Sequence, residues 1–169
     1  MKKLSLILIL LTSIILLSGC GIYNLNCFTL PDDIEFLALI QELNTPKKIC
    51  QYMADNFTYE AHAFYAPSPY TLWKTGRGDC NDFATFGIFI ANYHDYETYL
   101  AKIYYKNTNY QHILAVYKEN GYYTFSDNQY YNPYGQSYIL FSDIIQIYNG
   151  WLSYIIYDYD MNIVKQYTK

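Results

Sequence analysis

The sequence predicts one α+β domain in which helices come first and an antiparallel sheet follows. Apolar residues recur at helical spacing up to about residue 92, and from residue 100 onward the period changes to two. Asn120-Gly121 lies between two alternating stretches and is a strong signal for a two-residue type I′ hairpin. The 169 residues are enough for one domain with a sizeable core, and they contain no internal repeat.

The first twenty residues have the features of an export signal. Two lysines precede an apolar run over residues 4–17, and small residues follow it. The ending Leu17-Ser18-Gly19-Cys20 resembles a bacterial lipobox. This resemblance implies a lipoprotein signal peptide at 1–19, a lipid on Cys20, a tether at 20–31 and a domain at 32–169. The anchored protein would face outside the cytoplasm, on the cell membrane or an outer membrane. An ordinary signal peptide or an anchor helix is the alternative.

Charge excludes one class of partner. Without the two lysines of the signal, the chain has nine basic and 15 acidic residues, a net charge of about −6. A nucleic-acid-binding protein needs a basic stripe, so we expect no nucleic-acid partner. Polybasic membrane binding is disfavoured for the same reason, and attachment would depend on the lipid.

Three cysteines remain beyond the lipid site, and an odd number in an exported protein predicts a free thiol. Cys27 and Cys50 could form a disulfide that leaves Cys80 free. Cys50 also fits the apolar face of a helix, where it would be a core residue.

Two helices are expected before the cysteine turn. Asp32 or Asp33 can cap the first, and Thr45 followed by Pro46 can start the second. Over residues 59–75 the periodicity fades and two prolines, at 67 and 69, would break a helix. We expect this long irregular segment to form a wall of a cleft over Cys80.

The turn before residue 80 places a cysteine at the start of a helix. Gly76 and Gly78 permit tight backbone conformations, and Asp79 is a good N-cap for a helix that continues to about Asn92. Cys80 then occupies the first turn, where the helix dipole and unpaired N–H groups favour the thiolate. A small buried cysteine is the plainer interpretation of the same residue.

Four strands are expected, with a short helix between Ser142 and Gly150. The strands cover residues 100–105, 111–118, 122–127 and 151–157. A two-residue loop at Asn120-Gly121 pairs Glu119 with Tyr122, and this fixes the register of the whole hairpin.

This register places His112 and Asp127 on one face, as diagonal neighbours within side-chain reach. Leu114, Val116 and Phe125 share that face and are apolar, so we expect it to turn toward the core and the central helix. A carboxylate that accepts one ring N–H of a histidine fixes the tautomer and leaves the other nitrogen for a thiol. Taken alone, a histidine in a strand is more often a packed or surface histidine than a catalytic one.

The run Gly78-Asp79-Cys80-x-Asp82-x-Ala84, with His112 and Asp127 after it, resembles the transglutaminase-like superfamily. The resemblance covers residues 73–129 and implies a papain-like core, with a cysteine at a helix N-terminus packed against a sheet that carries His and Asp. It implies Cys80 as nucleophile, His112 as general base and acid, and Asp127 as its orienter. The Cys80 N–H would be one oxyanion donor, and Trp73 is a candidate for the second.

The resemblance implies thiol-dependent acyl transfer through a thioester. Cleavage of an amide or peptide bond in a protein or peptide substrate is our first expectation. Two alternatives stay open: protein crosslinking, in which an amine resolves the acyl-enzyme, and a catalytically silent surface-binding module. We expect no cofactor, and no metal site, because His62 and His94 show no metal-ligand spacing.

Overall fold

The computed structural model describes residues 30–62 and 68–169. The predicted signal peptide, Cys20, Cys27 and nearly all of the tether lie outside the described residues. In the described part of the chain, no helix is both long and apolar enough to span a bilayer. The described elements are α2 (Ile34–Glu42), α3 (Pro46–Asn56), β1 (Thr58–Tyr59), α4 (Pro69–Thr75), β2 (Arg77–Gly78), α5 (Cys80–Tyr93), β3 (Glu97–Tyr105), β4 (Gln111–Glu119), β5 (Tyr122–Asp127), β6 (Tyr130–Tyr131), α6 (Phe141–Ile145), β7 (Trp151–Asp158) and β8 (Ile163–Thr168).

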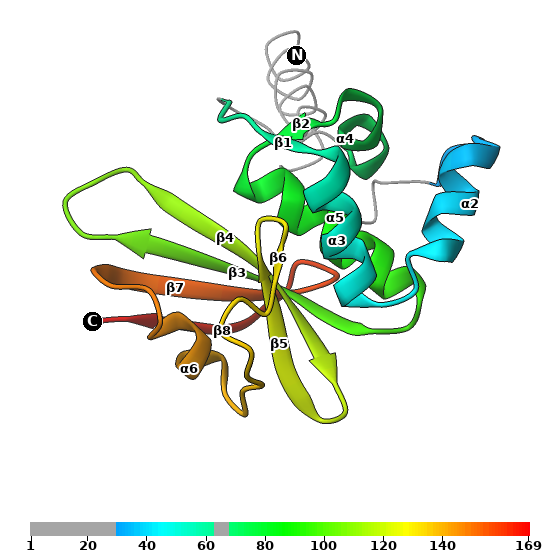
Figure 1. The fold of residues 1–169 in the computed structure, drawn as a ribbon. Coiled ribbons are helices and arrows are strands. Elements are labelled where there is room, and N and C mark those ends of the chain that lie inside the picture. Colours follow the sequence, from blue (N-terminus) through cyan, green and yellow to red (C-terminus); the bar gives the residue numbers. More distant parts are fainter. Residues whose placement is uncertain (1–29, 63–67) are drawn as a thin grey trace, which may run out of the picture.

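The main sheet has six antiparallel strands in the order β6-β5-β4-β3-β7-β8. Helices α2 to α5 gather on one side of it, and α6 lies beside β7 and β8 on the other (Figure 1). Strands β1 and β2 form a small parallel pair just before α5. The α+β architecture with a central helix packed on an antiparallel sheet is therefore confirmed.

Helices α2 and α3 begin at caps that the sequence predicts. Asp33 accepts hydrogen bonds from the N–H groups of Glu35 and Phe36, at 3.0 and 3.2 Å. Thr45 accepts from the Lys48 N–H at 3.2 Å, with proline as the first residue of the helix. Each cap satisfies N–H groups that lack a partner inside the helix, which fixes where the helix starts.

The expectation of an irregular segment over residues 59–75 is wrong in its second half, where α4 forms. Ser68 is the N-cap and accepts from the Thr71 N–H at 3.1 Å, and Pro69 is the first helical residue. Proline at this position loses no hydrogen bond, because that N–H has no partner in any helix, so Pro69 starts the helix rather than breaking it. The helix ends at Gly76, whose φ of +64° is a left-handed conformation that glycine adopts without strain.

The central helix α5 is buried on all sides over residues 82–91. It packs against Ile113, Ala115 and Tyr117 of β4. The other face of β4, with Leu114 and Val116, belongs to a second core that also contains Ile144 and Ile145 of α6. The expectation that the central helix covers the face of Leu114 and Val116 is therefore wrong. Residues 113–117 are all buried, so both faces of β4 are covered. A continuous apolar run of this kind does not show which face of the strand the helix contacts.

The hairpin register is confirmed. The pairs run from Glu119–Tyr122 to Ala115–Ser126, and Asn120 and Gly121 both have positive φ, as a type I′ turn requires. The pairing of β4 with β5 ends at Ala115–Ser126. The register would next pair Asp127 with Leu114, but Asp127 pairs with Tyr130 of β6.

The C-terminal part differs from the expectation in two places. Helix α6 begins at Phe141 and ends at Ile145, so Ser142 is not its N-cap and Gly150 is not its end. The observed N-cap is Leu140, two residues earlier than expected, and Phe141 is buried against Tyr123, with ring centroids 4.3 Å apart. The polar tail forms the edge strand β8, all of whose residues are exposed. The strand at 151–157 is confirmed as β7.

Candidate active site

Cys80 is the first residue of α5, and two carboxylates fix the turn before it. Asp79 accepts from the Asn81 N–H at 2.9 Å, and Asp82 accepts from the Asp79 N–H at 2.7 Å, forming a capping box. Neither of these bonds uses the Cys80 N–H, which as the first amide of the helix has no intrahelical carbonyl partner. The half-buried thiol and this amide therefore lie together at the positive end of the helix dipole.

Gly78 allows the Asp82 carboxylate to reach back to the cap. A Cβ atom at this position would lie 2.6 Å from Asp82 Oδ2 and 2.8 Å from Leu72 Cδ1. The strand pair with Tyr59 fixes the Gly78 backbone from the other side. The motif therefore needs glycine here for close approach and not for an unusual φ angle.

His112 and Asp127 meet as predicted. His112 Nε2 lies 2.9 Å from Asp127 Oδ1, and the imidazole is largely buried. The other ring nitrogen, Nδ1, is buried and makes no hydrogen bond of standard geometry with the described residues. Cys80 lies close enough to the ring to influence its protonation. The three predicted residues thus come together where the first turn of α5 meets the start of β4.

This arrangement favours a charged imidazolium. Burial disfavours the charged ring, but the hydrogen bond with Asp127 and the nearby Cys80 together outweigh burial and raise the pKa of His112 to about 9. Burial likewise opposes ionisation of Asp127, yet its hydrogen bond and charge interaction with His112 lower the pKa of that carboxyl. At neutral pH the pair is therefore imidazolium and carboxylate.

Tyr148 completes the pair and was not predicted from the sequence. Its hydroxyl donates to Asp127 Oδ2 at 2.7 Å, and its ring centroid lies 5.6 Å from that of His112. Burial and the adjacent Asp127 raise the pKa of the Tyr148 hydroxyl, so it remains a donor. Both oxygens of Asp127 thus have donors, which fixes the plane of the carboxylate against the imidazole.

A second histidine lies near the cysteine turn. His62 Nε2 is 2.5 Å from Asp82 Oδ2, and this hydrogen bond raises the pKa of His62. Burial raises the pKa of the Asp82 carboxyl, and its two donors oppose that rise. The pair ties the segment after β1 to the capping box of α5.

His62, Asp79 and Asp82 offer possible metal-ligand atoms within 4.8 Å of one another. The hydrogen bonds above already use all three side chains, and we assign no metal to them. Asp82 Oδ1 is a buried oxygen without a hydrogen-bond partner among the described residues.

Two exposed tyrosines lie near Cys80. Tyr59 is paired with Gly78, and Tyr110 precedes β4 and contacts Tyr105, with ring centroids 5.3 Å apart. Partial burial and then the charge of Cys80 raise the pKa of both hydroxyls. The charge of Cys80 therefore reaches the hydroxyls of both tyrosines.

Trp73, the predicted second oxyanion donor, lies in an aromatic cluster between α4 and α2. Its ring centroid is 5.0 Å from that of Phe36 and 5.7 Å from that of Tyr70, and Lys74 Nζ lies 4.2 Å from its centroid. Among the described residues, its ring–ring contacts are with Phe36 and Tyr70 and do not include His112. Its role as an oxyanion donor stays a prediction.

Cys50 behaves as the core residue that the sequence allows. It is 1 % exposed and has a free thiol on α3, and burial raises the pKa of that thiol to about 12. Cys27, its possible disulfide partner, lies outside the described residues.

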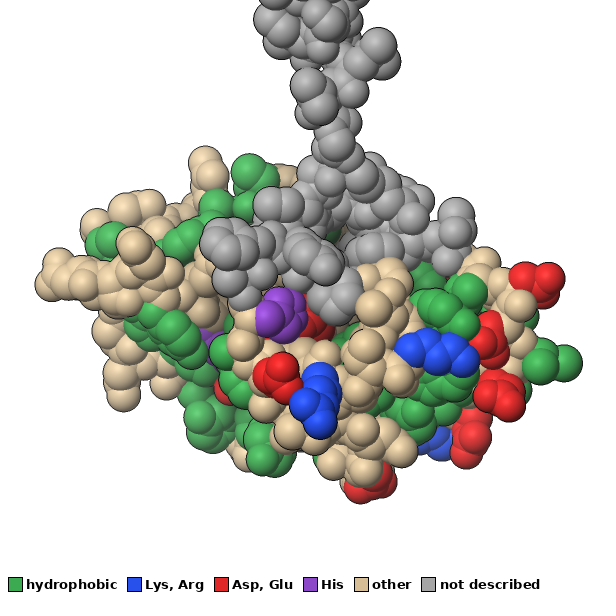
Figure 2. All heavy atoms as spheres, turned by 90° about the horizontal axis from the view of Figure 1, so that it is seen from above, with side chains coloured by type: hydrophobic (Ala, Val, Ile, Leu, Met, Phe, Trp, Pro, Cys, Tyr) green, Lys and Arg blue, Asp and Glu red, His purple; other side chains and the backbone are tan. Residues whose placement is uncertain are grey.

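Charges on the face seen from above are mixed. Figure 2 shows Lys and Arg side chains there beside Asp and Glu side chains. Arg77 pairs with Glu60 at 3.2 Å and Lys74 with Asp33 at 2.9 Å, so these cations are locally compensated.

Comparison with protein-family models finds no match, and comparison with curated protein sequences finds none either. Solved structures with a similar backbone include LapG of Legionella pneumophila, at a TM-score of 0.48 and 15 % identity, covering 78 % of this chain and 71 % of that one. A candidate cysteine protease from Cytophaga hutchinsonii has a TM-score of 0.44 and 14 % identity, covering 83 % of this chain and 58 % of that one. The likeness concerns the course of the backbone only.

Proposed function

We propose that this protein is a thiol-dependent acyl-transfer enzyme that hydrolyses an amide or peptide bond. The observation that supports this most is the state of the His112 ring. One nitrogen binds Asp127 at 2.9 Å, and the other is buried near Cys80 and makes no hydrogen bond of standard geometry with the described residues. An imidazole held on one side and available to a thiol on the other is the arrangement that nucleophilic cysteine catalysis needs.

In the proposed reaction the Cys80 thiolate attacks the substrate carbonyl carbon, and the carbonyl oxygen takes the electron pair. The Cys80 N–H donates to this oxyanion. The His112 imidazolium transfers its Nδ1 proton to the departing amine as the C–N bond breaks, which leaves a thioester. Water then attacks the thioester and gives a proton to His112, and the thiolate departs as the acid forms. Asp127 and Tyr148 hold the ring orientation through both steps.

The first test measures the alkylation of Cys80 by iodoacetamide from pH 6 to pH 10. We expect rapid reaction already at pH 7, and a rate about tenfold lower in His112→Ala, because the ion pair is lost. Cys50 is an internal control, since its buried thiol with a pKa of about 12 should not react in the folded protein. Equal rates in the two proteins would show that His112 does not activate Cys80.

The second test separates hydrolysis from its alternatives. Labelled peptides report bond cleavage, and a fluorescent primary amine reports transfer to protein glutamine. Cleavage that Cys80→Ala abolishes without loss of folding supports the proposal. Amine incorporation without cleavage supports crosslinking instead, and a reactive thiol with neither activity supports a silent binding module.

We also propose that a lipid on Cys20 anchors the protein outside the cytoplasm, where its substrate would be a protein or peptide. The lipobox residues at 17–20 support this. Labelled palmitate should enter the wild-type protein in bacteria and not the Cys20→Ser variant. Equal labelling of both proteins would exclude this attachment site.

A further inference from the structure

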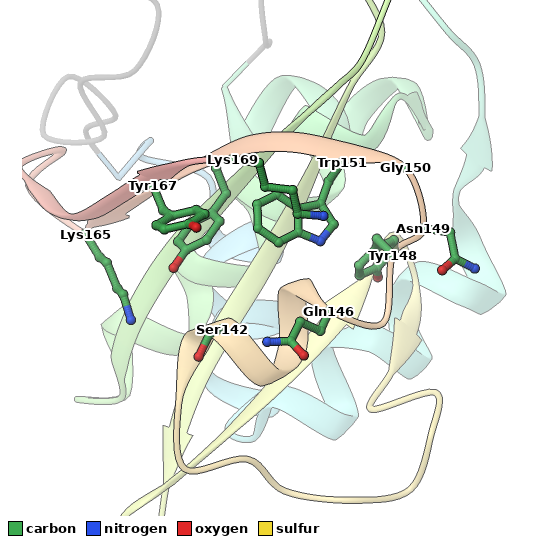
Figure 3. Close-up of a pocket in the computed structure, with 10 residues that line it drawn as sticks. Ser142, Gln146, Tyr148, Asn149, Gly150, Trp151, Lys165, Tyr167 and Lys169 are labelled. Carbon is green, nitrogen blue, oxygen red and sulfur yellow. The ribbon is translucent and has the colours of Figure 1, made fainter.

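A pocket of about 610 Å³ lies between α6 and the hairpin of β7 and β8, beside the candidate active site. Figure 3 shows Gln146 approaching it from α6, Trp151 and Lys169 lying against each other across from it, and Tyr148 and Asn149 at one end. The Tyr148 hydroxyl binds Asp127, so this residue separates the pocket from the His112–Asp127 pair. None of the three proposed catalytic residues lines the pocket.

One wall is aromatic and held in place by the sheet. Tyr154 and Tyr167 are direct partners across β7 and β8, and their rings are stacked with centroids 6.0 Å apart. Trp151 lies 5.7 Å from Tyr154 and 5.9 Å from Tyr167, measured between centroids. Tyr167 is 52 % exposed and therefore offers open ring surface. Such fixed rings can stack against the C–H face of a sugar ring at little entropic cost.

The pocket carries positive charge in an acidic chain. Lys165 and Lys169 both line it, and no acidic residue does. Lys169 Nζ lies 3.5 Å from the centroid of Trp151, which places a cation directly beside the aromatic wall. Among the described residues, the lysines that form ion pairs are Lys74 and Lys118. The two lysines of the pocket therefore have no carboxylate partner in an ion pair within this part of the chain. Two ammonium groups lining one pocket favour a ligand that carries a carboxylate.

The opposite wall is polar. Ser142, Gln146 and Asn149 contribute a hydroxyl and two amides, groups that both donate and accept hydrogen bonds, as sugar hydroxyls require. An extended peptide binds chiefly through backbone hydrogen bonds along a strand edge, whereas these three residues offer side-chain hydroxyl and amide groups. The lining therefore favours a saccharide over a peptide.

We propose that this pocket binds a carboxylate-bearing saccharide, with a sugar ring against the exposed ring of Tyr167 and the carboxylate attracted by the positive charge of Lys165 and Lys169. The site does not depend on the proposed catalytic activity, because it uses none of the reacting groups. Tyr148 lines this pocket and also binds Asp127, so a bound saccharide would lie next to the His112–Asp127 pair.

The test uses the full chain and trigalacturonate as the probe, measured by calorimetry, with maltotriose as the neutral comparison. We expect the double variant Lys165→Gln/Lys169→Gln to bind trigalacturonate about tenfold or more weakly, and maltotriose to bind the wild type more weakly by a similar factor. Tyr167→Ala should weaken binding of both saccharides, because it removes the open ring. The double variant Lys47→Gln/Lys106→Gln has the same charge change outside the pocket and should bind as the wild type does.

Three results would overturn the proposal. One is no binding of trigalacturonate at about 10 mM, a concentration that detects even millimolar affinity. Another is an equal loss of affinity in the two double variants, which would mean general charge attraction. The third is a trimer of aspartate that binds as tightly as trigalacturonate, because the pocket would then recognise acidic peptides. Circular dichroism confirms in each case that the variant is folded.

Discussion

Tyr148 donates a hydrogen bond of 2.7 Å to the one oxygen of Asp127 that His112 does not use. The tyrosine comes from the turn after α6, whereas the aspartate ends β5, so the contact joins two parts of the chain that are distant in sequence. The ring of Tyr148 also covers the imidazole from one side. The catalytic pair is therefore held by a residue that neither the cysteine motif nor the hairpin contains.

Replacement of this hydroxyl should disturb the pair without removing any reacting group. In Tyr148→Phe, Asp127 Oδ2 keeps its partial burial and loses its donor, which costs about 1–3 kcal/mol of unfolding free energy. We expect the alkylation rate of Cys80 at pH 7 to fall by about 3–10-fold, because the imidazolium is less well oriented. The exposed Tyr122→Phe is the control and should change neither quantity. A Tyr148→Phe protein with unchanged alkylation would show that the contact is only structural.

The Asp127 carboxylate should control the protonation of His112. In Asp127→Asn the charge interaction is lost and burial dominates, so the pKa of His112 should fall from about 9 to near or below its ordinary value of 6.5. Imidazole proton signals in NMR report this titration directly, and the chain has only three histidines to assign. Asp143→Asn removes an exposed carboxylate from α6 and should leave the titration unchanged. A value that stays near 9 in Asp127→Asn would contradict the assigned cause.

The hairpin and the cysteine turn could be predicted because short local signals determine them. Asn120-Gly121 alone fixes the register, and Asp79 alone fixes the start of α5. The face of β4 that meets α5 could not be predicted, since residues 113–117 are apolar on both faces. The start of α4 could have been predicted, because Ser68 before Pro69 is the same cap-and-proline signal as Thr45 before Pro46.

Other parts of the site have no local signal. Tyr148 is one of 23 tyrosines, and nothing around it in the sequence distinguishes it from the rest. His62 lacks metal-ligand spacing, and its role appears only through the contact with Asp82, twenty positions away. Strand β8 has no buried face, so it leaves no alternating apolar pattern to detect.

Stability should depend on pH through His112. Its pKa is about 9 in the folded protein and about 6.5 in an unfolded chain, so its contribution is complete below pH 6.5 and disappears as the pH rises through 9. The shift corresponds to a contribution on the order of 3 kcal/mol. Urea unfolding of the wild type and of His112→Gln at pH 6 and pH 10 isolates this effect from other groups. The difference between the two proteins should shrink at pH 10, and a constant difference would refute the linkage.

Gly78 should be irreplaceable for reasons of space. Alanine there would place its Cβ 2.6 Å from Asp82 Oδ2 and 2.8 Å from Leu72 Cδ1, so the capping box or α4 must shift. We expect Gly78→Ala to lower the unfolding free energy by about 1–3 kcal/mol and to slow Cys80 alkylation, because the first turn of α5 loosens. The Asp82 Cβ would itself lie 2.7 Å from the added atom, so an Asp82→Gly background removes both contacts with residue 82, and the cost of Gly78→Ala should be smaller there. If the cost is equal in both backgrounds, the contact with Leu72 alone must account for it, and the glycine of the motif would then serve α4 rather than the cap of the cysteine helix.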